Sequence, residues 1–236
     1  FFPEKRLFFQ EGIEVFTATP RAEDKRPVTL LNTRRIGGVG REPTLPEGVT
    51  ITDPERQKPV ELAGALKTVG SIGALRYGLL GAVEKEAIYK AQGQRFVESG
   101  TDYGVGRVLY EDKTAAGDYR AIGWLGALTA HAEQDTQAHG VDYHYLTATG
   151  KWKLDGQFLF SSADERTDGF GGFADIRRNF GQGRRLHLGY GFYDEHLDIN
   201  DLGYLQRNDL RGGNGRYEVT RSESRRFRKT SVAYWF

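Results

Sequence analysis

The chain has 236 residues with 38% hydrophobic and 28% charged residues, and its 33 basic and 32 acidic residues leave a net charge of +1. A mean hydropathy of -0.57, with no apolar run near the ~20 residues that a spanning helix needs, excludes a helical membrane protein. The evenly mixed charges exclude a nucleic-acid-binding surface, and the absence of cysteine excludes disulfides and thiolate metal sites.

The opening segment, residues 1–26, combines charges with phenylalanines and is predicted to form an entry or plug segment. It begins Phe1-Phe2-Pro3-Glu4 without an initiating methionine or signal peptide, so we expect that an export signal, if the protein has one, lies upstream. Two interpretations are open, a charged gate and a structural plug whose charges pair internally. The charges concerned are Glu4, Lys5, Arg6 and Glu11.

Residues 27–236 alternate between apolar and polar residues in segments of about ten, separated by turn-forming clusters. The clearest segment places Trp152, Leu154 and Phe158 on one face, and polar residues on the other. The pattern predicts about eleven strands. They are expected near 27–37, 58–69, 72–83, 102–110, 118–130, 141–145, 152–162, 172–180, 185–194, 213–221 and 226–236.

Short and long connections alternate between these predicted strands, which favours an antiparallel up-and-down transmembrane β-barrel of the outer-membrane type. Such a barrel has short periplasmic turns and long outer loops, whereas a soluble β-sandwich, the alternative, has no reason to separate them. The odd strand count places Phe236 at the outer surface, so we expect the chain to be an incomplete segment that continues further.

Polar residues on one strand face are candidates to line a lumen, where charges tune the selectivity of a barrel. Adjacent arginines must face opposite ways in a regular strand, so at most one of the pair at 34 and 35 enters the lumen. Alternatively, the basic residues, with Arg107, pair with Asp142, Asp155 and Asp175 across neighbouring strands. The candidates are Arg34, Arg35, Lys67, Arg76, Asp142, His144, Lys153, Asp155, Gln157 and His187.

Catalytic and metal-binding patterns are not recognisable. The acidic loop 194–209 lacks the regular spacing of a calcium-binding loop, and the five histidines lack metal-ligand spacing. No nucleophile, base and orienting group occur together. The sequence therefore predicts no cofactor and no metal, and leaves enzymatic activity uncertain.

Several blocks of the sequence resemble a domain-of-unknown-function family whose β-barrel follows a carbohydrate-binding family 9-like β-sandwich domain. Residues 1–12 resemble the motif at the start of that barrel, and residues 32–37 and 62–70 are similar to its first two strands. Residues 140–143 resemble another strand start, and residues 200–209 an outer-loop motif. The positions of interest in the outer-loop motif are Asp201, Arg207, Asn208 and Asp209.

The resemblance implies a protein of the bacterial outer membrane, in contact with the lipid bilayer, whose upstream carbohydrate-binding-like domain is absent from this chain. We therefore predict the wall of a channel or transporter, with a saccharide as the possible ligand. One alternative is a carbohydrate-active hydrolase of the cell envelope, because relatives in this family are sometimes labelled as hydrolases. The other is a soluble β-sandwich binding module.

Overall fold

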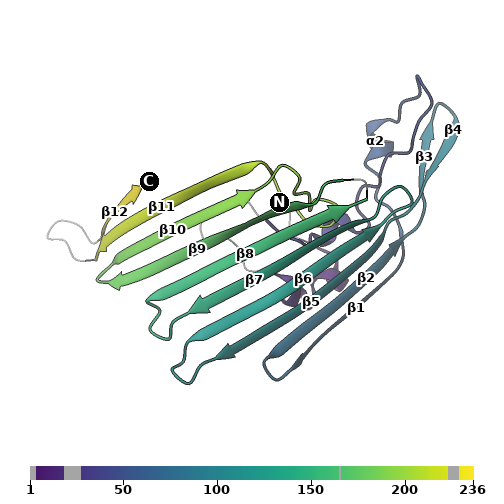
Figure 1. The fold of residues 1–236 in the computed structure, drawn as a ribbon. Helices are drawn as coiled ribbons and strands as arrows, with labels where there is room; N and C mark the ends of the chain where they lie inside the picture. The colour runs from purple at the N-terminus through teal and green to yellow at the C-terminus, as the bar shows by residue number, and fades with distance from the viewer. Residues whose placement is uncertain (1–3, 19–27, 165, 223–228) are drawn as a thin grey trace.

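The computed structural model describes residues 4–18, 28–164, 166–222 and 229–236. Ten antiparallel strands form one sheet in which every strand pairs with its neighbours along the chain, apart from an inserted hairpin (Figure 1). These strands are β1 (Leu62–Ile72), β2 (Leu75–Glu84), β5 (Asp102–Lys113), β6 (Tyr119–Ala130), β7 (Thr136–Leu146), β8 (Trp152–Ala163), β9 (Gly169–Gly181), β10 (Arg184–Tyr193), β11 (Leu210–Arg221) and β12 (Thr230–Trp235).

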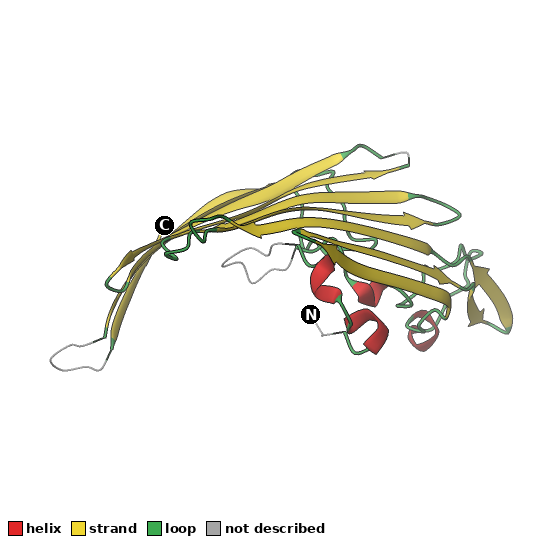
Figure 2. Cartoon of the chain, turned by 90° about the horizontal axis from the view of Figure 1, so that it is seen from below, coloured by secondary structure: helices red, strands yellow, loops and turns green. Residues whose placement is uncertain are grey.

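The predicted all-β, antiparallel, up-and-down fold is confirmed, and the sheet is open over the described residues. The β-sandwich alternative is wrong, because a sandwich needs two sheets packed face to face, whereas the described residues form one ten-stranded sheet and a separate two-stranded hairpin. Figure 2 shows that sheet as a single curved layer, with the short helices gathered on its concave side. Among the described residues, no helix is long and apolar enough to cross a membrane.

The two faces of the sheet differ in chemistry. On β6, Leu125 and Ala127 are buried on the concave face, whereas Ile122, Trp124 and Leu128 are exposed on the convex face. A similar alternation runs along β2, β5 and β7 to β10. Exposed apolar side chains of the convex face include Leu66, Ile72, Leu79, Val83, Val108, Val141, Tyr143, Phe158, Phe170, Ile176, Leu188 and Tyr190.

The strand predicted for residues 27–37 is wrong. Thr33–Arg35 form a short 3-10 helix (η2), and Thr29 forms only an isolated bridge to Tyr204. Leu30, Leu31 and Ile36 are all buried in one cluster, so their apolar pattern reflects packing onto the sheet rather than alternation within it.

The remaining short elements lie in the N-terminal region. They are α1 (Leu7–Gln10), η1 (Ile13–Phe16) and α2 (Asp53–Arg56). The hairpin of β3 (Ala87–Ala91) and β4 (Gln94–Glu98) lies within a segment that we predicted to be a plain loop. Tyr89 of this hairpin is buried and its hydroxyl donates to the carbonyl of Arg41, 2.8 Å away. Burial raises the pKa of this hydroxyl.

The long connections lie together at one end of the sheet, but there are fewer than predicted. Connections 85–101 and 194–209 are long and share that end, which supports the predicted sidedness. The loops predicted at 131–139 and 163–171 are shorter, because β7 and β9 extend into them and Thr136 pairs with Ala163. Without the 27–37 strand, the first strand of the sheet is β1, which corresponds to the predicted strand 58–69 and begins at the long-connection end.

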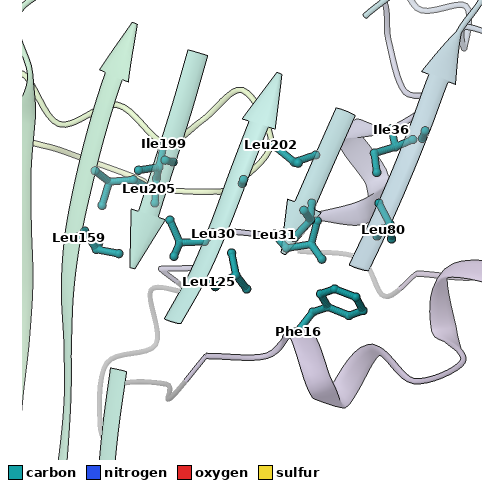
Figure 3. Close-up of a cluster of buried hydrophobic side chains, with 14 of the residues drawn as sticks. Phe16, Leu30, Leu31, Ile36, Leu80, Leu125, Leu159, Ile199, Leu202 and Leu205 are labelled. Carbon is teal, nitrogen blue, oxygen red and sulfur yellow. The ribbon is translucent and has the colours of Figure 1, made fainter. Parts of the chain in front are cut away.

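A hydrophobic cluster joins the N-terminal region to the concave face (Figure 3). Phe16 and Leu30 come from the N-terminal region, Leu125 and Leu159 from the sheet, and Leu202 from the β10–β11 connection. Phe16 lies so close to Gly78 of β2 that a Cβ there would be 2.7 Å from its ring. Two distant segments therefore fold over the same face of the sheet.

Candidate functional site

The predicted plug charges Glu4 and Arg6 pair with each other. The guanidinium of Arg6 donates to the Glu4 carboxylate through Nε at 3.0 Å and Nη2 at 2.8 Å. Arg6 also donates to the backbone carbonyls of Thr33 and Ile36, at 2.7 and 2.6 Å. Through these hydrogen bonds, the opening motif contacts residues 32–37, the second motif of the resemblance.

Glu4 is held in its ionised form by this arrangement. Hydrogen bonds from the Arg6 side chain, with smaller contributions from the Arg6 backbone and Thr33, lower the pKa of Glu4 to about 2. The Thr33 hydroxyl donates to Glu4 at 2.8 Å. The Glu4 carboxylate therefore accepts hydrogen bonds from Arg6 of the opening motif and from Thr33 of the second motif. These charged hydrogen bonds join the two motifs.

The other two predicted plug charges have different surroundings. Lys5 is exposed, and its backbone N–H donates to Glu4 at 2.9 Å. The backbone carbonyl of Glu11, with that of Phe8, accepts a hydrogen bond from Lys67 of β1. Lys67 thereby anchors α1 to the first strand of the sheet.

The second motif is tied to the sheet through Glu84 of β2. The N–H of Gly37 donates to the Glu84 carboxylate at 2.7 Å, and the hydroxyl of Tyr103 on β5 donates to it at 3.1 Å. Gly37 has a φ of 64°, a conformation that glycine adopts readily. This turn directs the chain from the second motif onto the sheet.

The outer-loop motif also contacts the N-terminal region. The N–H of Asn32 donates to the carbonyl of Leu202 at 2.7 Å, and Arg41 lies 3.6 Å from the carboxylate of Asp201. Gly203 packs so closely that a Cβ would be 2.4 Å from the carbonyl of Thr29. Three motifs that are far apart in the sequence therefore meet on one face of the sheet.

The other predicted positions of this loop have separate roles. Asn208 donates to the carbonyls of Glu195 and Leu197, at 2.8 and 3.3 Å, and so closes the loop on itself. Asp209 has a φ of 47° at the entry to β11, and Arg207 is exposed.

The basic residues predicted to line a pore near the N-terminus do not form a common surface. Arg34 and Arg35 lie in η2 and not in a strand, so the expectation that they face opposite sides of a sheet is wrong. Arg76 of β2 lies 3.3 Å from Glu111 and 3.7 Å from Glu14. Together with Lys67, these side chains hold the N-terminal region and neighbouring strands.

The concave face also carries buried charges. Arg107 of β5 forms two hydrogen bonds with Asp142 of β7, at 2.5 and 3.0 Å. The pairing alternative named these partners but placed such pairs on neighbouring strands, whereas β6 lies between β5 and β7. Gln157, beside Asp142 in the strand register, is buried, and neither polar atom of its side chain has a hydrogen-bond partner among the described residues.

Two rows of side chains cross the concave face below this pair. The first row contains His144, Asp155 and Asp175, which occupy paired positions on β7, β8 and β9. His144 contacts the carboxylate of Asp155, and His187 of β10 lies 3.5 Å from Asp175.

The second row is basic. Lys153, Arg177, His187 and Arg216 occupy directly paired positions on β8, β9, β10 and β11. They border a hollow of about 360 Å³ at the short-turn end of these strands. Lys153 and His187 were predicted as lumen-lining residues, whereas Arg177 and Arg216 were not.

The missed arginines carry no distinctive sequence signal. Arg177 is followed by Arg178, and alternation alone does not say which of the two shares a face with Lys153. Only the register of β8 with β9, which pairs Lys153 with Arg177, decides it.

The geometry does not favour the hydrolase alternative. Asp155 and Asp175 are directly opposed, and a hydrolase needs two carboxylates close together, but these two are only 1% and 2% exposed. Each contacts basic side chains, Lys153 at 3.0 Å in the case of Asp155. A sugar ring has no access to either carboxylate.

No protein-family model and no curated protein matches this sequence. Among solved structures, the chain is similar to a loop L8 deletion mutant of OmpT, an outer membrane protein of Vibrio cholerae, with 14% identity and a TM-score of 0.37 over 82% of this chain. It is also similar to the trimer form of in-vitro folded OmpT, with 13% identity and a TM-score of 0.40, covering 89% of this chain and 75% of that one. The chain covers 57% of the length of the deletion mutant.

Proposed function

We propose that this chain forms part of the wall of an outer-membrane β-barrel that acts as a channel or transporter in a bacterium with an outer membrane. The observation that carries the proposal is the contrast between the two faces of one sheet. Large apolar side chains are exposed on the convex face, while charges and a docked N-terminal region occupy the concave face. A lipid bilayer outside and a polar lumen inside would satisfy both faces.

The strand dimensions support this proposal. The strands β5 to β11 contain 10 to 13 residues, which suits a tilted strand that crosses the hydrocarbon core. On the convex face near the short turns, the guanidinium of Arg178 lies 4.2 Å from the ring centre of Trp152 and 5.1 Å from that of Phe180. Aromatic and basic side chains of this kind are typical of the membrane interface.

The N-terminal region is proposed to act as a plug or gate. It packs on the concave face through Phe16 and Leu30, and the Glu4–Arg6 pair holds its two motifs together. A solute that crosses this lumen would have to pass beside the plug or displace it. Lys5 and Glu11, with Glu4 and Arg6, belong to this proposed gate.

A saccharide cargo rests on the family resemblance alone. In that family, the barrel follows a carbohydrate-binding-like domain, which would deliver sugars to the lumen. The outer-loop motif around Asp201 and the hollow between Arg35, Arg41 and Asp201 are the places where such a cargo would first meet this chain.

Fractionation and conductance of the intact protein test this function. We expect it to sediment with outer membranes, to show heat-modifiable migration on gels, and to conduct ions in planar bilayers. Substituting Arg6→Ala together with Phe16→Ala should raise the conductance, because the plug loses its ion pair and a buried phenylalanine ring. A protein that stays soluble without detergent would refute membrane insertion, and a folded, inserted protein without conductance in either form would refute the channel.

A further inference from the structure

The basic row on β8 to β11 is an unusual arrangement for a sheet. Lys153, Arg177, His187 and Arg216 face the same side on four successive strands, at spacings of about 4.8 Å. Lys153 and Arg177 are directly opposed, and like charges in such positions destabilise a sheet. A row of this kind therefore needs compensating negative charge.

The protein supplies part of this compensation. Lys153 lies 3.0 Å from Asp155, Arg216 lies 3.1 Å from Glu218, and His187 lies 3.5 Å from Asp175. Lys151 and Arg185 also border the same hollow, whereas the guanidinium of Arg178 lies against the ring of Trp152 on the convex face. Glu218 is the one acidic residue among the described residues that line it, so positive charge exceeds negative charge along this part of its wall.

The hollow has the size and the donors of a binding site for a small anion. Its volume of about 360 Å³ lies within the range of small-molecule sites. Its arginines come from three different strands, so their donors approach a ligand from several sides. Guanidinium groups bind phosphate and carboxylate oxygens in pairs, with stronger hydrogen bonds than neutral donors provide.

We propose that this hollow binds small solutes that carry phosphate or carboxylate groups. The proposal rests on the proposed function in one respect, since the solute would reach the hollow through the lumen. The basic row lies on the concave face, next to buried Asp175 and away from the exposed apolar side chains, which favours a free solute over a lipid headgroup. The hollow would then be an anion-selective binding site in the lumen, near the short turns.

Titration calorimetry of the intact protein in detergent, with inorganic pyrophosphate as the probe, tests the site. We expect binding that weakens as salt is added and becomes roughly tenfold weaker or more in the variant Arg177→Gln/Arg216→Gln, because charged hydrogen bonds are lost. Lys151→Gln, in an exposed turn position, should weaken binding less and serves as a second variant if the double variant does not fold. Arg211→Gln is the matched control, because Arg211 lies on β11 an odd number of residues from Arg216 and so on the opposite face.

Each outcome decides the proposal. Absence of pyrophosphate binding to the folded protein, or equal binding by the double variant, would overturn it. Binding of anionic phospholipid in bicelles without any binding of pyrophosphate would also overturn it, in favour of a headgroup site. Because calorimetry in detergent does not depend on ion flow, this result is independent of the conductance measured for the channel.

Discussion

Arg107 and Asp142 meet across an intervening strand. Arg107 lies on β5 and Asp142 on β7, and their two hydrogen bonds pass over Gly123 of β6. A Cβ on Gly123 would lie 2.6 Å from Nη2 of Arg107. The absence of a side chain at this position is therefore what allows one ion pair to bridge three strands.

Removing the carboxylate should destabilise the fold strongly. Substituting Asp142→Asn leaves the Arg107 guanidinium, which is 1% exposed, without its charged partner, and we expect a loss of about 3 to 5 kcal/mol in the free energy of unfolding. Guanidinium chloride titrations of the protein folded into lipid vesicles measure it. The control is Asp112→Asn, which breaks the exposed Asp112–Arg120 pair and should have little effect. If both variants lose the same free energy of unfolding, burial does not determine how much an ion pair contributes to stability.

Filling the space below the ion pair should have a similar but smaller effect. Gly123→Ala forces the Arg107 guanidinium to move away from Asp142, and overpacking of this kind costs about 1 to 3 kcal/mol. Gly104→Ala is the matched control, since a Cβ there meets only Leu128, at 3.9 Å. The same vesicle titrations apply. If both alanine variants unfold at the same denaturant concentration, Gly123 has no special role.

The fold class followed from alternation because the convex and concave faces differ along almost every strand. Trp152, Leu154 and Phe158 share a face as predicted, and Lys153 and Asp155 share the other. Alternation specifies this well because a slip of one residue would exchange the faces. The same reasoning predicted a strand at residues 27–37, which is wrong. The apolar residues of this segment pack onto the sheet without forming a regular strand.

The contacts of the site could not be predicted, because they join residues through register and tertiary packing. Glu4 and Arg6 were named among the charges of either a gate or an internally paired plug, but nothing in the sequence places them against Thr33 and Ile36. Arg177 likewise acquires its neighbours from two strand registers that alternation leaves open. Sequence reasoning therefore identified several residue types and faces, while the pairs required coordinates.

The docking of the N-terminal motif should depend on pH through Glu4. Its pKa is lowered from 4.5 to about 2 in the folded protein, so its contribution to stability is fully present above pH 4.5 and is lost as the pH falls toward 2. Glu4→Gln should therefore lower the unfolding midpoint at pH 6, and the difference from the wild type should shrink below pH 4.5 and vanish near pH 2. Glu47→Gln, at an exposed loop position, is the control and should show no such trend. A constant difference between the Glu4→Gln variant and the wild type across this range would argue against the ion pair.

Phe16 should control how firmly the N-terminal region covers the sheet. It is 2% exposed and packs on Gly78, so Phe16→Ala removes about 3 to 5 kcal/mol of packing from this contact. Because the chain has no cysteine, the substitution Ala82→Cys introduces a single reporter on β2, on the same face as Gly78 and 3% exposed in the native protein. We expect a water-soluble maleimide to label this reporter slowly in the otherwise native protein and much faster when Phe16→Ala is added. Phe158→Ala, which removes an exposed ring from the convex face, is the control and should leave the labelling rate unchanged. If Phe16→Ala labels as slowly as the control, the N-terminal region is held by its polar contacts, and the Glu4–Arg6 pair becomes its principal attachment.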